Sequence, residues 1–156
     1  MPRRADIKPR KLPRDPKHES VLVTQVVNRV MRDGKRSTAE KIVYDALDTV
    51  QEKTGRPALE VLEQAVKTVT PVLEVRSRRV GGANYQVPVE VNARRARTLA
   101  IRWIVTHARQ RREYGMSDKL AGELQDALQH QGGAYKKKDD VYRMAQANKA
   151  FAHYKW

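Results

Sequence analysis

The sequence of 156 residues contains no cysteine. Disulfide bridges, thiolate nucleophiles and zinc sites built on thiolates are therefore excluded. Histidine is also scarce: the four histidines are scattered, and none stands in a helical metal-binding spacing such as H-E-x-x-H. These absences remove the commonest thiol and metal chemistries, and we expect neither a metal nor a cofactor.

The sequence also lacks an apolar run long enough for a transmembrane helix. Its first residues, MPRRADIKPRK, are basic but lead into no apolar stretch with a small-residue cleavage site, unlike a secretory signal. Asp6, Asp15 and four prolines up to residue 16 argue against an amphipathic mitochondrial presequence. We therefore expect a soluble, cytoplasmic protein with no membrane partner.

Acidic residues are few: 18 of them face 32 lysines and arginines, which leaves a formal net charge of +14. An excess of this size repels itself in the compact state and indicates a polyanionic partner, either nucleic acid or an anionic membrane surface. The length fits one domain, and 40% hydrophobic residues are enough for a core.

The apolar spacing predicts a mainly α-helical single domain of about six helices over residues 20–156. Residues 1–19, broken by proline, are expected to form a basic flexible arm. We expect Ser20, Asn92 and Ser117 to be N-caps and Ser37 with Glu40 to form a capping box. The expected helix ends are glycines: Gly55, Gly115 and the pair Gly132-Gly133.

A protruding two-stranded β-hairpin is expected over residues 72–91, between the third and fourth helices. Tyr85, Val87, Val89 and Val91 alternate with period two, and residues 81–84, GGAN, form the turn. Pro88 cannot donate a ladder hydrogen bond, so its strand lies at an edge or in an isolated ribbon. Such a ribbon is barely stable alone and is often stabilised by contact with a binding partner.

Nothing in the sequence indicates catalysis. The glycine pair at 81–82 lies inside the hairpin, not in a phosphate-binding loop between a strand and a helix. Asp45, Asp48 and Glu52 fit a solvated helix face better than a carboxylate cluster. We therefore predict that the protein is not an enzyme and has no catalytic residue.

The basic residues are better organised than the acidic ones. Strand alternation places Arg76 and Arg78 on one face of the hairpin, about 7 Å apart, and Arg79 on the other. That spacing is close to the phosphate step of a nucleic acid backbone, and the guanidinium fork suits phosphate. The alternative is a charged edge that only prevents sheet aggregation.

Three further basic sites leave alternatives open. Lys136, Lys137 and Lys138 lie either in the first turn of the last helix, where they oppose its dipole, or in a solvated loop before it. Arg94 and Arg95 raise the same question at the fourth helix, and Lys35 with Arg36 is a basic pair in a loop. At the tail, His153, Tyr154 and Trp156 stack on bases or pack on the body, whereas Trp103 is expected in the core.

Four segments carry a close resemblance to a known family. They are residues 30–35, VMRDGK; 75–88, VRSRRVGGANYQVP; 132–141, GGAYKKKDDV; and 144–156, MAQANKAFAHYKW. They resemble the bacterial small-subunit ribosomal protein number seven, and the hairpin motif is the most specific of them. In residues 1–19 only the basic character is shared.

The resemblance implies a structural constituent of the small ribosomal subunit. Members of this family are primary rRNA-binding proteins that bind the 3′ major domain and nucleate assembly of the head. They lie at the subunit interface near the decoding centre and the tRNA exit site, beside exit-site tRNA and messenger RNA. Their protein neighbours are ribosomal proteins number nine and number eleven, and we expect a monomer outside the ribosome.

Carried over by position, the resemblance implies the binding residues. The residues nearest tRNA and messenger RNA would be the hairpin tip, Gly81, Gly82, Ala83, Asn84 and Tyr85. The rRNA surface would comprise Arg3, Arg4, Lys8, Arg10, Lys11, Lys35, Arg36, Arg76, Arg78, Arg79, Arg94, Arg95, Arg102, Lys136, Lys137 and Lys138.

The alternative from another class is a DNA-bending architectural protein, because such proteins also extend β-ribbon arms from helical bodies. Those arms usually act in pairs from a dimer and carry an apolar or proline wedge at the tip. Here the tip is GGAN and Pro88 lies near the base, which weighs against a wedge. A membrane-surface role is less favoured, because the basic residues do not form one amphipathic helix.

Overall fold

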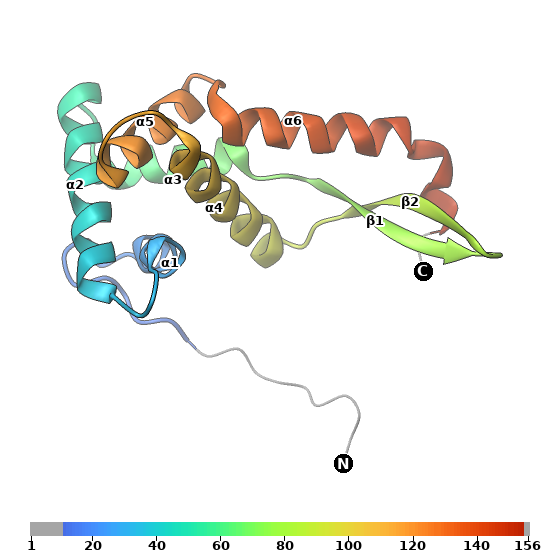
Figure 1. Ribbon diagram of the computed structural model, residues 1–156, viewed down its shortest axis with the longest axis horizontal. Helices are drawn as coiled ribbons and strands as arrows, with labels where there is room; N and C mark the ends of the chain where they lie inside the picture. The colour runs from blue at the N-terminus through green and yellow to red at the C-terminus, as the bar shows by residue number, and fades with distance from the viewer. Residues whose placement is uncertain (1–10, 155–156) are drawn as a thin grey trace, which may run out of the picture.

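The computed structural model describes residues 11–154 and confirms the mainly helical fold with a hairpin between the third and fourth helices (Figure 1). A short 3-10 helix, η1, follows the sixth α-helix. In chain order the elements are α1 (Val21–Val30), α2 (Arg36–Thr54), α3 (Ala58–Val69), β1 (Leu73–Val80), β2 (Ala83–Glu90), α4 (Ala93–Gln110), α5 (Met116–Leu128), α6 (Gly132–Ala147) and η1 (Lys149–Tyr154).

The core lies among the helices of the body, where valine, leucine and alanine from the inward faces of α1 to α5 meet. Leu47, Leu62, Leu120 and Leu124 are each about 1% exposed. Burial of one such side chain stabilises the fold by roughly 1.5–3 kcal/mol. Trp103 is only partly buried and packs against this core instead of lying inside it.

Two predicted N-caps are confirmed. The Ser20 hydroxyl accepts a hydrogen bond from the Leu22 amide at 3.2 Å, and Asn92 Oδ1 accepts one from the Arg94 amide at 2.9 Å. Each side chain satisfies an amide that the helix itself leaves without an acceptor. Gly55 ends α2 in the left-handed conformation, with φ of 67°, as predicted.

Three predicted helix boundaries are wrong. The capping box of Ser37 and Glu40 does not form, because α2 begins one residue earlier and Glu40 binds the Arg36 side chain. Similarly, α5 begins at Met116 after Gly115, so Ser117 lies inside the helix. The fourth helix ends at Gln110 and not at Gly115.

The glycine pair 132–133 begins α6 and does not close α5. Gly132 adopts a φ of +85°, and a Cβ on Gly133 would lie 2.6 Å from His107 Nδ1. The first glycine therefore serves the turn, and the second allows α6 to approach α4 closely.

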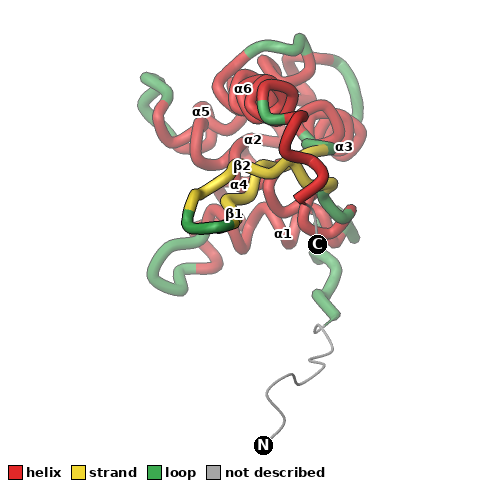
Figure 2. The backbone as a smooth tube through the Cα atoms, turned by 90° about the vertical axis from the view of Figure 1, so that its right-hand side faces the viewer, coloured by secondary structure: helices red, strands yellow, loops and turns green. Residues whose placement is uncertain are grey.

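The hairpin is a two-stranded antiparallel ribbon that extends from the body (Figures 1 and 2). Gly81 and Gly82 form its tip, both with positive φ, which suits a two-residue hairpin turn. The ribbon runs beside α6 and contacts η1: the Tyr85 ring lies 5.1 Å from the ring of Phe151 and 5.2 Å from that of Tyr154. The described part of the tail thus packs on the ribbon; Trp156 lies outside the described residues.

Part of the arm expected over residues 1–19 is packed on the body. Pro13 and Asp15 form hydrogen bonds with side chains of α1 and α2, and Asp15 is only 2% exposed. Packing therefore begins before residue 19. Residues 1–10 lie outside the described range. Within residues 11–154, no helix is both long and apolar enough to cross a membrane, and no group of His, Asp and Glu is arranged to hold a metal ion.

Candidate nucleic-acid interface

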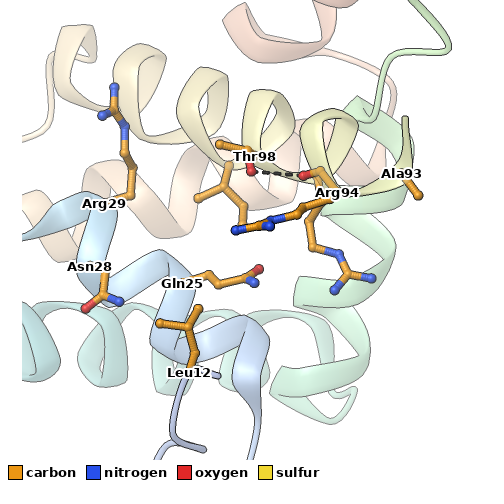
Figure 3. A pocket seen from close by; sticks show the side chains of 9 residues that line it. Leu12, Gln25, Asn28, Arg29, Ala93, Arg94 and Thr98 are labelled. Carbon is orange, nitrogen blue, oxygen red and sulfur yellow. Dashed lines mark hydrogen bonds between the residues drawn. The ribbon is translucent and has the colours of Figure 1, made fainter. Parts of the chain in front are cut away.

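A basic cleft lies between α1 and the first half of α4 (Figure 3). It has a volume of about 530 Å³, and three arginines contribute to it: Arg29 from α1, and Arg94 and Arg97 from α4. The other lining residues are polar or apolar, and none of them is acidic: Leu12, Gln25, Asn28, Ala93, Thr98 and Ile101. We call this the α1–α4 cleft.

The cleft follows from the amphipathic pattern of its two helices. In α1, the apolar residues Val23, Val26, Val27 and Val30 face the core, which leaves a polar face that includes Gln25, Asn28 and Arg29. In α4, Ala96, Ala100 and Ile101 are buried, while the arginines of its first turns are exposed. The two polar faces meet across the cleft.

The electrostatics of the cleft favour an anion. Among the described residues, no carboxylate forms an ion pair with Arg29, Arg94 or Arg97, so their charges are not neutralised locally. Arg94 also lies in the first turn of α4, where a cation opposes the helix dipole by about 0.3–1 kcal/mol. A phosphate bound here would offset the repulsion among the three arginines and the repulsion between Arg94 and the helix dipole.

A second basic group surrounds Arg109, near the C-terminal end of α1. Arg109 Nη2 donates to the backbone oxygens of Arg29 and Val30 at 3.3 and 3.2 Å, where it satisfies carbonyls at the helix end. Burial, followed by the nearby charges of Arg32 and Arg29, lowers the pKa of Arg109. The adjoining pocket of about 490 Å³ is also lined by Lys35 and Lys119, and by Asp33 as its one acid.

At the base of the ribbon, Glu74 forms ion pairs with two of the predicted binding residues and offsets part of their charge. Its side chain is 11% exposed; Arg76 Nε donates to Oε1 and Arg95 Nε to Oε2, both at 2.6 Å. Burial by itself raises the pKa of Glu74, but the hydrogen bonds from Arg95 and Arg76 outweigh it and hold the pKa below its ordinary value. These two arginines join β1 to α4.

The register confirms that Arg76 and Arg78 share one face of the ribbon and Arg79 lies on the other. Arg76 is opposite Val87, and Arg78 is opposite Tyr85, which packs on η1. The face that carries these two arginines is therefore the one that contacts the body. Arg79, opposite Asn84, is exposed, and Arg78 is half-buried.

Neither interpretation of the lysine run is correct. Because α6 begins at Gly132, Lys136, Lys137 and Lys138 lie in its second turn, not in its first turn and not in a loop. Lys138 Nζ donates to the backbone oxygen of Thr68 at 2.6 Å, near the end of α3, so it serves the packing of α6 on the body. Lys136 and Lys137 are exposed.

The remaining predicted residues are dispersed. Lys11, Lys35 and Arg102 are exposed, and the exposed Arg36 forms an ion pair with Glu40 at 2.7 Å. The tip residues 81–84 are exposed, whereas Tyr85 is half-buried. The other four predicted residues of the arm lie outside the described range: Arg3, Arg4, Lys8 and Arg10.

Five basic residues of this surface are missing from the sequence prediction: Arg29, Arg32, Arg97, Arg109 and Lys119. In the sequence, such residues can be recognised only as members of the polar face of a helix. On α1 and the residues after it, Gln25, Asn28, Arg29 and Arg32 recur at intervals of three, one and three residues, opposite the valines. The pattern marks these residues as exposed, but only the fold shows that they face α4.

The chain is similar to known proteins over its full length. A family model described as Ribosomal protein S7p/S5e matches residues 2–149. The chain is 58% identical to the small ribosomal subunit protein uS7 of Dictyoglomus turgidum, 59% to that of Carboxydothermus hydrogenoformans and 56% to that of Heliobacterium modesticaldum. Each of these matches covers 156 residues, the whole of this chain and the whole of the relative.

Proposed function

The chain belongs to the ribosomal protein S7p/S5e family, and from this premise we propose that it is a primary binder of small-subunit rRNA. The proposal is that it binds the 3′ major domain and nucleates assembly of the subunit head. Family membership itself makes the chain a ribosomal protein of the small subunit, cytoplasmic and not an enzyme, as expected from the resemblance.

The observation that carries the proposal is the α1–α4 cleft. Its three arginines have no carboxylate among their lining neighbours, and the ribbon and the Arg109 group extend the basic surface on either side. Arginine forks neutralise phosphates, and the released counterions supply much of the affinity. A folded RNA junction would be recognised mainly by shape, because its deep major groove is closed to side chains.

The proposal also includes the location on the subunit. We place the ribbon tip, Gly81 to Tyr85, beside exit-site tRNA and messenger RNA near the decoding centre. Support comes from the resemblance of residues 75–88 and from the projection of the ribbon beyond the body (Figure 1). For protein neighbours such as ribosomal proteins nine and eleven, the exposed Val72, Tyr142 and Met144 offer apolar surface. Outside the ribosome we propose a monomer.

The experiment measures binding of the purified protein to a folded head fragment of small-subunit rRNA. Unrelated duplex RNA and DNA of equal length, at moderate salt, serve as competitors. Substitution of Arg29, Arg94 and Arg97 by alanine should weaken binding to the head fragment about 100-fold, since each phosphate contact contributes roughly 1 kcal/mol. The matched control replaces Lys53, Arg56 and Arg143, which lie on other surfaces, and should change affinity less than about threefold by general electrostatics.

A large preference for the head fragment, lost in the cleft variant only, would support the proposal. Equal affinity for all three nucleic acids would contradict it and would favour the DNA-bending alternative. The ribbon set Arg76, Arg78 and Arg79 forms a second arm of the experiment. We expect a smaller loss from that set, because Glu74 already offsets part of the charge of Arg76.

A further inference from the structure

One buried carboxylate holds the base of the basic arm against the body. Asp15 is 2% exposed, and its Oδ2 accepts hydrogen bonds from the amides of Lys17 at 3.1 Å and His18 at 3.0 Å. Its Oδ1 accepts from the hydroxyl of Tyr44, on α2, at 2.7 Å. The same side chain therefore closes a turn in the arm and fastens that turn to the body.

A second hydrogen bond fastens the arm to α1. Thr24, which is 1% exposed, donates from Oγ1 to the backbone oxygen of Pro13 at 3.0 Å. Burial, and then the hydrogen bond to Asp15, raise the pKa of Tyr44 to about 12, so its hydroxyl stays a donor across the neutral range. We call Pro13, Asp15, Thr24 and Tyr44 the arm latch.

The arm latch leads the chain into the α1–α4 cleft. Leu12, the residue before Pro13, lines the cleft together with Arg29, Arg94 and Arg97 (Figure 3). Lys11, directly before Leu12 in the chain, is exposed. The residues before it carry four more cations in the sequence, at positions 3, 4, 8 and 10. The attachment point of the arm thus coincides with the unneutralised arginines.

We propose that Asp15, acting through Tyr44 and assisted by the hydrogen bond from Thr24 to Pro13, is a positioning residue that makes the arm and the cleft act on the same segment of RNA. This inference rests on the proposed function. With the latch open, residues 12–19 keep only weak contacts, such as the exposed Lys17–Asp48 ion pair, and behave as a flexible tether with a root-mean-square length of about 15 Å. The effective concentration of the arm cations at cleft-bound RNA then falls.

A double-mutant cycle in the full-length protein separates positioning from simple stability. Thr24→Val with Tyr44→Phe removes both latch hydroxyls at almost unchanged volume. Arg3, Arg4, Lys8 and Arg10 are replaced by alanine to neutralise the arm. Opening the latch should weaken binding to the head fragment about fivefold with the native arm and less than about twofold with the neutral arm. The control, Thr68→Val with Tyr142→Phe, removes two hydroxyls outside the latch and should change neither affinity.

The absence of cysteine permits a direct second readout. A single cysteine introduced by Ala5→Cys can carry an iron chelate that cleaves nearby RNA by hydroxyl radicals. With the latch closed, we expect cleavage at one narrow group of nucleotides. With the latch open, the same probe should cleave a broader region, which a purely stabilising role of Asp15 would not produce.

Each outcome decides the inference. Equal losses with the native and neutral arms, together with an unchanged cleavage pattern, would overturn it. If circular dichroism shows that the double latch variant is unfolded, Tyr44→Phe alone is used in the same cycle. A wild-type protein without preference for the head fragment removes the proposed function and this inference together, whereas a normal preference with an additive cycle removes only the inference.

Discussion

Arg111, directly after the end of α4, and Arg94 and Arg97, near its start, have opposite surroundings. Arg111 donates to Glu113, Glu123 and Asp126 at 2.8, 3.2 and 2.5 Å. Burial lowers its pKa, but these hydrogen bonds outweigh burial and raise it. Arg94 and Arg97, at the start of the same helix, line a cleft to which no acidic residue of the described range 11–154 contributes. The charge of Arg111 is therefore paired within the fold, whereas the charges of Arg94 and Arg97 are available to an anionic partner.

The Arg111 end is built around a buried acid. The Glu123 side chain is 2% exposed, and its Oε1 accepts from the amide of Ala134 at 2.8 Å, in the first turn of α6. Gly122 makes room for the guanidinium, because a Cβ there would lie 2.7 Å from Arg111 Nη2. This group joins α5, α6 and the loop after α4, so it should matter for stability and not for RNA.

The largest expected effect is on this buried group. Glu123→Ala removes the acceptor of a buried amide and one partner of Arg111, so we expect the free energy of unfolding to fall by about 3 kcal/mol. Urea denaturation followed by circular dichroism measures the loss. Glu63→Ala, at an exposed position of α3, is the control. A loss below about 0.5 kcal/mol would show that the group does not hold the helices together.

The second largest expected effect is on the salt dependence of RNA binding by the α1–α4 cleft. For the cleft variant (Arg29, Arg94 and Arg97 to alanine), the slope of log affinity against log salt should become shallower by between about 2 and 3. The reason is that three phosphate contacts no longer release counterions. Binding titrations at several salt concentrations provide the slope, and urea denaturation should show little change in stability. An unchanged slope would mean that these arginines do not touch phosphate.

Glu74 lies between the two extremes, because its arginine partners are about half exposed. Its pKa is lowered in the folded state, so its contribution is present above the pKa of the unfolded chain, about 4.3. The contribution is lost as the pH falls from there through the lower folded pKa. Glu74→Gln should therefore reduce stability by about 1 kcal/mol at pH 7 and by progressively less in acid. Urea denaturation at a series of pH values checks this; a difference independent of pH would exclude ionisation as its source.

The smallest expected effect concerns an exposed ion pair. Lys17 Nζ lies 2.9 Å from Asp48 Oδ2, with both side chains about half exposed. Solvent screening limits such a pair to less than about 0.5 kcal/mol. Asp48→Asn should hardly change the unfolding midpoint or the RNA affinity. A larger loss would mean that the arm latch depends on this pair as well as on Asp15.

Local sequence signals predicted an element well where one side chain could satisfy its own helix. Ser20 and Asn92 are N-caps because each is itself extended and precedes an amphipathic run. Ser37 has the same chemistry, but α2 already begins at Arg36, whose side chain binds Glu40. Ser37 therefore lies inside the helix and is not a cap. The glycine pair 132–133 was placed at the wrong helix, because its role is set by contacts with Glu123 and His107.

The class of the protein was predictable from the order and composition of its residues. The charge of +14, the apolar periodicity and the VRSRRVGGANYQVP segment are local or compositional properties, and they predicted a helical RNA-binding protein with a ribbon. Which cations stay free of acidic neighbours depends on the packing of the helices and the ribbon. Coulomb interactions depend on distance in space, and folding brings Glu123 and Asp126 to Arg111, Glu74 to Arg95, and α1 to α4. For that reason Arg29 and Arg97 line the candidate site, while Arg76, Arg95 and Lys138 form contacts within the fold.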